Sequence, residues 1–219
     1  MAEPTERLTR TIWLGVALVI VLICFTYVNA RLKPVAPGAF VPLPVIGPVA
    51  DFTLTNQSGR TVTLADLRGR VWLADIIFTR CPGPCTRMTR QMKSIQDALP
   101  SASRAQLVSL TTDPDFDSPK VLAEYGQRFG ANPDRWTFLT GPKKDIAHLA
   151  IDSLKLTTVE KKPEERQSDD DLFVHSTIFV LMDKQARLRG VYETGGDGVE
   201  WTNVHPVILS AIQRLEHEP

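Results

Sequence analysis

The sequence has no excess of charge of either sign, no internal repeat and very little cysteine. It carries 25 basic and 25 acidic residues among 219, so charge gives no reason to expect binding to nucleic acid or to an anionic surface. Of the three cysteines, Cys24 lies in an apolar segment, which leaves only Cys81 and Cys85 for the rest of the chain. A disulfide-stapled scaffold needs more than one pair. We therefore interpret this pair as functional rather than structural.

Residues 12–30 are uncharged and almost wholly apolar. As a helix they would be about 28 Å long, close to the roughly 30 Å of a bilayer core. We therefore predict residues 1–11 as a short cytoplasmic (or matrix-side) N-terminus and residues 12–30 as an uncleaved transmembrane anchor. The alternatives are a cleaved signal peptide and a lipoprotein at Cys24, but the cleavage pattern is poor and Ile23 is bulkier than the small residue at such sites.

A run rich in proline follows, between residues 31 and 50. Its prolines disfavour both a helix and a central strand, so this segment is predicted to be an extended, semi-stiff tether. Residues 51–219 are then long enough for one domain with its own core.

From residue 51 the chain alternates predicted strands and helices. Residues 71–78 form a continuous apolar run, typical of a central strand buried on both faces. Apolar residues at helical spacing, from Met88 to Leu99, predict a helix after the cysteines. The further elements are hairpins at 51–64 and 177–192, strands at 106–111 and 136–139, and helices from 119, at 143–154 and from about 205 to 218. This order predicts an α/β fold, a thioredoxin-like three-layer sandwich with an added N-terminal β-hairpin.

Cys81 and Cys85 stand where the predicted central strand passes into the next helix, in the run Cys-Pro-Gly-Pro-Cys. Unpaired amides and the dipole at the start of a helix favour thiolate over thiol. Two thiolates are soft ligands that suit Cu(I), with Zn(II) as the usual competitor. The same spacing also permits a redox disulfide.

A metal would need a third ligand, and the sequence offers four histidines. His148 lies in a predicted amphipathic helix, His205 stands at a predicted helix start and His217 is near the terminus. His175 ends a charged loop and immediately precedes the predicted strand 177–182. In a thioredoxin-like sheet the loop entering that strand faces the cysteine helix, so we predict His175 as the third ligand.

Four segments resemble the Sco/SenC family of membrane-anchored copper proteins. They are FTRCPGPCTRM (78–88), TTDPDFDSPKVLAEYGQRFG (111–130), WTFLTG (136–141) and VHSTIFVLMD (174–183). The resemblance implies a copper site of Cys81, Cys85 and His175. It also implies a partner, subunit II of cytochrome c oxidase, whose dinuclear copper site receives copper or has its cysteines reduced. Cu(I) is the expected ion, with Cu(II) and Zn(II) as further ions for the same ligands.

Other residues receive plainer interpretations. Asp75 is costly in a buried strand unless it is hydrogen-bonded or paired, and we expect a structural carboxylate rather than one that serves the metal. Met88 and Met92 have helical spacing and are expected in the core rather than on copper. The acidic residues 169–171 precede His175, and we hypothesise that they guide a partner or copper donor to the site.

The leading functional hypothesis is a copper metallochaperone, a binding and transfer protein rather than an enzyme, at the inner or plasma membrane. Its soluble domain would lie on the non-cytoplasmic side. The alternative is a membrane-anchored thiol-disulfide oxidoreductase that reduces partner cysteines through Cys81 and Cys85.

Overall fold

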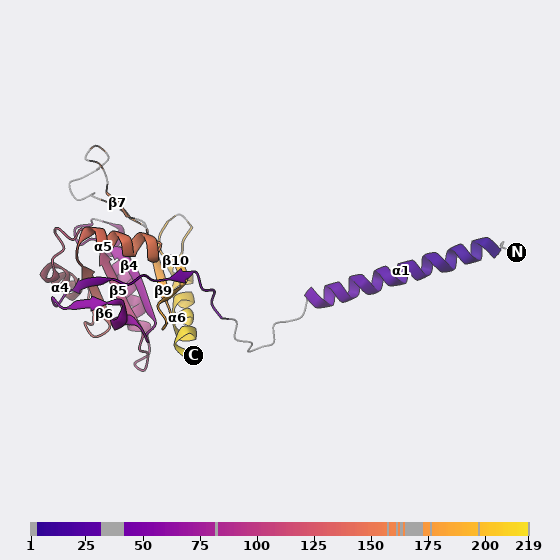
Figure 1. Ribbon diagram of the computed structural model, residues 1–219, viewed down its shortest axis with the longest axis horizontal. Helices are drawn as coiled ribbons and strands as arrows, with labels where there is room; N and C mark the ends of the chain where they lie inside the picture. Colours follow the sequence, from indigo (N-terminus) through magenta and orange to yellow (C-terminus); the bar gives the residue numbers. More distant parts are fainter. Residues whose placement is uncertain are drawn as a thin grey trace. The chain divides into compact units, whose positions relative to one another are not determined.

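The structure is a computed structural model that forms two compact units, residues 1–41 and residues 42–219 (Figure 1). It describes residues 4–31, 42–81, 83–156, 158–160, 162, 164, 173–175, 177–196 and 198–218, without the side chains of 4–9, 11, 28–31, 158–160 and 173–175.

In the described part of the first unit, helix α1 (Pro4–Arg31) forms over the predicted apolar segment. Large apolar side chains of this helix are exposed, such as Leu14 at 71% and Ile23 at 60%. Among the residues that the structure describes, no helix has the length and apolarity needed to cross a membrane. The helix is thus confirmed, whereas the predicted membrane span over 12–30 is not.

The second unit is built on an eight-stranded mixed sheet with the order β1-β10-β9-β4-β5-β6-β2-β3. Strands β4, β5 and β6 are parallel, and the other neighbours are antiparallel. The strands are β1 (Gly47–Pro48), β2 (Thr53–Asn56), β3 (Thr61–Thr63), β4 (Trp72–Ile77), β5 (Gln106–Thr111), β6 (Trp136–Thr140), β9 (Ile178–Met182) and β10 (Arg187–Glu193). The predicted N-terminal hairpin is confirmed as β2 and β3, which extend the sheet beyond β6.

Helices cover both faces of this sheet, as the three-layer prediction requires. The helices of this unit are α2 (Leu64–Leu67), α3 (Pro84–Ala98), α4 (Pro119–Arg128), α5 (Lys143–Ala147), the π-helix η1 (His148–Ser153) and α6 (Trp201–His217). Apolar residues of α3, α4 and α6 form one core cluster with the sheet. Those of α2, α5 and η1 form the second, on the other face.

Strand β4 shows why the apolar run at 71–78 predicts a central strand. Its six residues are all buried. Because side chains alternate along a strand, Leu73 and Ile77 join the first cluster while Trp72 and Ile76 join the second. A strand with a core on each face must be apolar throughout.

Several elements differ from the prediction. The single helix expected at 143–154 is α5 followed by the π-helix η1. Helix α6 begins at Trp201 and continues through Pro206, which can take helical backbone angles but cannot donate an amide hydrogen bond. Two short paired strands, β7 (Thr158–Glu160) and β8 (Phe173–His175), have no counterpart in the prediction.

The end of the predicted tether is packed on the domain rather than extended away from it. Strand β1 pairs with the start of β10 at the sheet edge, where a proline is tolerated. Val49 is buried, and Arg189 donates to the carbonyl oxygens of Leu43 and Pro44, both at 3.1 Å from Nε. Residues 32–41 of the tether lie outside the described residues.

Candidate metal centre

The two cysteines lie between the end of β4 and the first turn of α3. Cys81 is 8% exposed and Cys85 is fully buried, and neither forms a disulfide. The amide of Cys85 donates to Sγ of Cys81 at 3.5 Å. The start of α3 therefore supplies a backbone donor to the first sulfur, as the predicted position at a helix N-terminus implies.

The protonation of the second cysteine differs from the prediction. Burial raises the pKa of Cys85 well above its usual range, and the hydrogen bond with Cys81 and the charges of Cys81 and Asp75 act in the same direction. Since desolvation outweighs the helix dipole, Cys85 is a thiol in the metal-free site rather than a thiolate. Binding of a metal or formation of a disulfide must remove this proton.

Asp75 lies in the core beside this pair. It is fully buried in β4, and strand alternation places it with Leu73 and Ile77, on the sheet face that also carries the cysteines. Its charge contributes to raising the pKa of both Cys85 and Tyr125. The carboxylate therefore belongs to the electrostatic surroundings of the cysteines, which the sequence favoured less than a purely structural role.

Tyr125 is a neighbour of the pair that sequence reasoning assigned only to a core face. The Tyr125 hydroxyl lies 2.7 Å from Oγ1 of Thr89. The Thr89 hydroxyl in turn donates to the carbonyl oxygen of Cys85 at 2.8 Å. Burial raises the pKa of Tyr125 above its usual range. The first turn of α3 is thus tied to α4 by a buried polar chain.

The loop between β5 and α4 holds the residues that precede Cys81. Asp117 is fully buried and accepts a hydrogen bond from the amide of Thr79 at 3.1 Å, a second from the Thr79 hydroxyl, and a third from the Thr111 hydroxyl at 2.5 Å. Asp113 pairs with Nη2 of Arg80 at 2.6 Å. Sequence reasoning saw this loop as a helix start, and Ser118 is indeed the N-cap of α4, but it missed the contacts to Thr79 and Arg80, which follow β4.

Three of the four histidines have local partners. Nδ1 of His148 lies 2.5 Å from an Asp152 oxygen, Nε2 of His205 lies 3.4 Å from the Ser94 carbonyl, and Nδ1 of His217 lies 2.6 Å from the Gln213 carbonyl. These contacts agree with the ordinary structural roles expected for them.

His175 is placed only by its backbone, at the end of β8 opposite Thr158. Its side chain and the acidic residues 169–171 lie outside the described residues, so the third ligand stays a prediction. Within the described part of the chain, no three His, Cys, Asp or Glu side chains gather as a metal site. Met88 and Met92 are fully buried in the core, as predicted.

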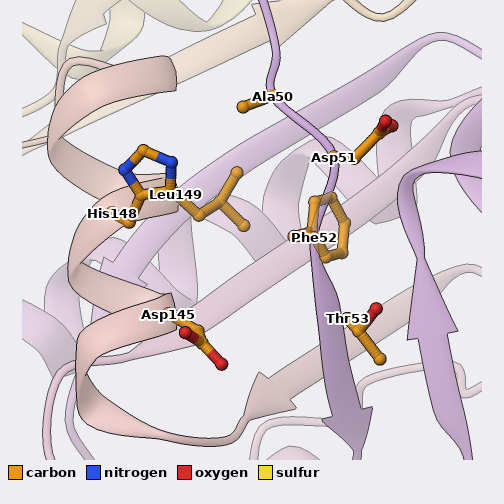
Figure 2. A pocket seen from close by; sticks show the side chains of 7 residues that line it. All are labelled: Ala50, Asp51, Phe52, Thr53, Asp145, His148 and Leu149. Carbon is orange, nitrogen blue, oxygen red and sulfur yellow. The ribbon is translucent and has the colours of Figure 1, made fainter.

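A cavity of about 310 Å³ lies elsewhere, where the chain enters β2 beside α5 and η1. Figure 2 shows His148, Leu149 and Asp145 on the helical side and Asp51, Phe52 and Thr53 on the strand side. No residue of the cysteine loop lines it. The chemistry of the cysteine pair therefore does not extend to this cavity.

Sequence comparisons connect the chain with one family. The SCO1/SenC family model matches residues 47–204. The SCO1 protein homolog of Bacillus subtilis is 35% identical over 162 residues, which cover 73% of this chain and 79% of that protein. A protein of Stutzerimonas stutzeri named as a candidate copper-binding protein is 28% identical over 65% of this chain and 67% of its own length.

Comparisons of structure agree with those of sequence. The structure of BsSco, a member of the Sco family of cytochrome c oxidase assembly proteins, superimposes with a TM-score of 0.67 and 28% identity, over 82% of this chain and 100% of that chain. A SCO1/SenC family lipoprotein from Bacillus anthracis gives a TM-score of 0.65 and 27% identity, over 80% and 99%. The chain therefore belongs to the SCO1/SenC family and has its thioredoxin-like fold.

Proposed function

We propose that the chain is a copper metallochaperone that binds Cu(I) through Cys81, Cys85 and His175 and assists assembly of the copper site of cytochrome c oxidase subunit II. The observation that carries the proposal is the pair of buried cysteines at the start of α3, which form no disulfide and have the Cys85 amide 3.5 Å from Sγ of Cys81. Two adjacent soft donors with little access to water suit Cu(I) better than a hard cation.

Two relatives support this assignment, one through copper binding and one through oxidase assembly. One relative is named as a candidate copper-binding protein, and BsSco is described as an oxidase assembly protein. Copper is cargo in this proposal. The residues of this chain would hold it, release the proton of Cys85 when it binds and keep the site largely closed to water.

Because Cys85 is protonated in the free protein, capture of copper should release at least one proton. The affinity for Cu(I) should therefore rise with pH. Zn(II) competes for the same thiolates and provides the necessary comparison in every titration.

A thiol-disulfide oxidoreductase is the second candidate, because two neighbouring cysteines in the reduced state can also form a disulfide. In that reaction the two thiols would give two electrons and two protons to a partner disulfide, which becomes a dithiol as Cys81 and Cys85 become linked. The BsSco structure is described as containing a disulfide switch, which favours the same chemistry in that relative.

One titration separates the two candidates. Reduced full-length protein is titrated with Cu(I) against a competing chelator, alongside His175→Ala and the matched control His148→Ala, which alters an exposed histidine paired with Asp152. Loss of a direct ligand should weaken Cu(I) binding by more than the roughly 10–100-fold cost of losing an outer-shell partner. If His175→Ala and wild type bind alike, the three-ligand site is wrong and thiol exchange becomes the better account.

The N-terminal helix has its own part in this proposal, attachment of the domain to a membrane on the non-cytoplasmic side. Its support is the uncharged stretch 12–30 and the lipoprotein relative from Bacillus anthracis. Full-length protein should remain with membranes after a carbonate wash, whereas a variant without residues 1–31 should not. Recovery of both in the supernatant would contradict the attachment.

A further inference from the structure

The chain leaves the sheet between the end of β4 and Cys81. The ladder between β4 and β5 closes with the Thr112 amide donating to the Ile77 carbonyl at 2.8 Å. Beyond it, Thr79 and Arg80 form a turn, and Cys81 donates to the carbonyl of Phe78 at 3.2 Å. The position of the first cysteine therefore depends on what holds this turn.

The carboxylate of Asp117 takes over where the ladder stops. It lies 38 residues from Thr79 in sequence and accepts from both the amide and the hydroxyl of that residue, while Thr111 donates to it from the end of β5. A single buried side chain thus links Thr79, which follows β4 and precedes Cys81 by two residues, to Thr111 at the end of β5. Asp117 is fully buried, so water does not compete for these bonds.

A neighbouring ion pair leaves Asp117 to this task. Asp113 holds the Arg80 guanidinium at 2.6 Å, and the same guanidinium stacks on Phe116, 4.1 Å from the ring centroid. Among the described residues, the side chain of Asp117 accepts from two threonine hydroxyls and one backbone amide rather than from a cation. The geometry of these hydrogen bonds, rather than a charge pair, therefore holds Thr79.

We propose that Asp117 is a positioning residue for the cysteine pair, which keeps Sγ of Cys81 beside the amide of Cys85. The inference rests on the proposed function in that it concerns the same thiols, but it applies equally to copper capture and to disulfide formation. Both reactions need the two sulfurs close together. Copper affinity and disulfide formation should therefore both become less favourable when the turn is no longer held by Asp117.

The test compares reduced full-length wild type with Asp117→Ala, Asp117→Asn and the control Asp115→Ala, which alters an exposed residue of the same loop. Cu(I) affinity is measured against a chelator, and the dithiol-disulfide midpoint potential is measured in a thiol redox buffer. Asp117→Ala should weaken Cu(I) binding about 10–100-fold. It should also shift the redox equilibrium about tenfold toward the dithiol, a rise of about 30 mV.

Asp117→Asn should restore most of both quantities, because the amide oxygen can accept from Thr79 and Thr111 while the amide nitrogen donates to the Thr79 hydroxyl. Asp115→Ala should equal wild type. A folded Asp117→Ala protein with wild-type affinity and potential would overturn the proposal and leave Asp117 as a structural residue only.

Loss of Asp117 could also prevent folding, and a milder variant covers that case. Thr79→Val removes the hydroxyl bond to Asp117 but keeps the amide bond, and it should move affinity and potential in the same direction by a smaller factor. Wild-type values in Thr79→Val would then count against the proposal. If wild type binds no Cu(I), the proposed function fails while the midpoint potential still tests the role of Asp117.

Discussion

Two buried carboxylates lie at opposite ends of the central strand, and the protein satisfies them in different ways. Asp117 stands near Cys81, beyond the last residue of β4, and accepts from Thr79 and Thr111. Asp183 follows Met182, which pairs with the first residue of β4. It accepts from Arg189 Nη1 and from Arg187 Nε, each at 2.8 Å.

The two acids have pKa values shifted in opposite directions. At Asp117 burial has the largest effect and raises the pKa, against the hydrogen bonds from Thr111 and Thr79. At Asp183 burial also acts to raise the pKa, but bonds from Arg189 and Arg187 outweigh it and the pKa is lowered. The neutral donors at Asp117 therefore do not offset the effect of burial on the pKa, whereas the bonds at Asp183, which include those from arginine side chains, more than offset it.

The difference suggests separate duties for the two ends. Arg189 joins Asp183, Glu218 after the last helix and the carbonyl of Leu43, so it ties segments from both ends of the domain to one turn. The cysteine end uses threonine hydroxyls and a backbone amide to set a geometry. We expect the first end to matter mainly for stability and the second mainly for the thiols.

The largest effect should come from Arg189→Met. Arg189 is 3% exposed. Its loss removes the buried cation between Asp183, which then keeps only the partly exposed Arg187, and the partly buried Glu218. The free energy of unfolding should fall by about 3–5 kcal/mol in denaturant titrations, while the midpoint potential of the cysteines stays at the wild-type value. Arg187→Met is the matched control, because its side chain is 40% exposed and such pairs contribute about 0–1 kcal/mol. Equal losses in both variants would remove the special role of Arg189.

A smaller effect should come from Thr111→Val, which keeps the shape of a fully buried side chain. The variant removes one donor to Asp117 and the acceptor for the amide of Asp113. The free energy of unfolding should be about 1–3 kcal/mol lower than that of wild type in denaturant titrations. The control is Thr140→Val, which alters a buried threonine of β6. This variant should change stability less. A Thr111→Val protein as stable as wild type would show that Asp117 does not depend on this hydroxyl.

The sequence predicts those parts of the fold that neighbouring residues determine. The apolar run of β4, the hairpin turned at Asn56 and the buried face of α3 with Met88 all depend on local patterns, and all are confirmed. Asn56 even accepts hydrogen bonds from Ser58 and Arg60 within its own turn.

Contacts between distant segments account for what the sequence could not predict. Nothing in the sequence near Thr79 indicates that its amide will donate to Asp117, because the two residues meet only when β4 and β5 pair. Likewise, the position of Cys85 at a helix start predicts a thiolate, but its pKa depends on burial by the whole domain. The segment 42–50 contains prolines that indicate a tether, yet Arg189 holds it from the far end of the sequence.

The smallest predicted effect is a difference in how stability depends on pH, and it tests the comparison most directly. Asp183 has a lowered pKa in the folded state, so its contribution is present above the unfolded pKa of about 3.9 and is lost as pH falls through the folded value. Asp117 has a raised pKa, so its contribution is present below about 3.9 and is lost as pH rises through the folded value.

Urea titrations between about pH 3 and pH 7 should therefore separate the two acids. Asp183→Asn should reduce the loss of stability on acidification, because the variant no longer has to take up that proton. Asp117→Asn should reduce the opposite loss, the one that accompanies deprotonation as pH rises from about 4. If both variants altered the same side of the pH profile, arginine and threonine donors would be equivalent here. The two ends of β4 would then differ only in position, not in how they hold a buried acid.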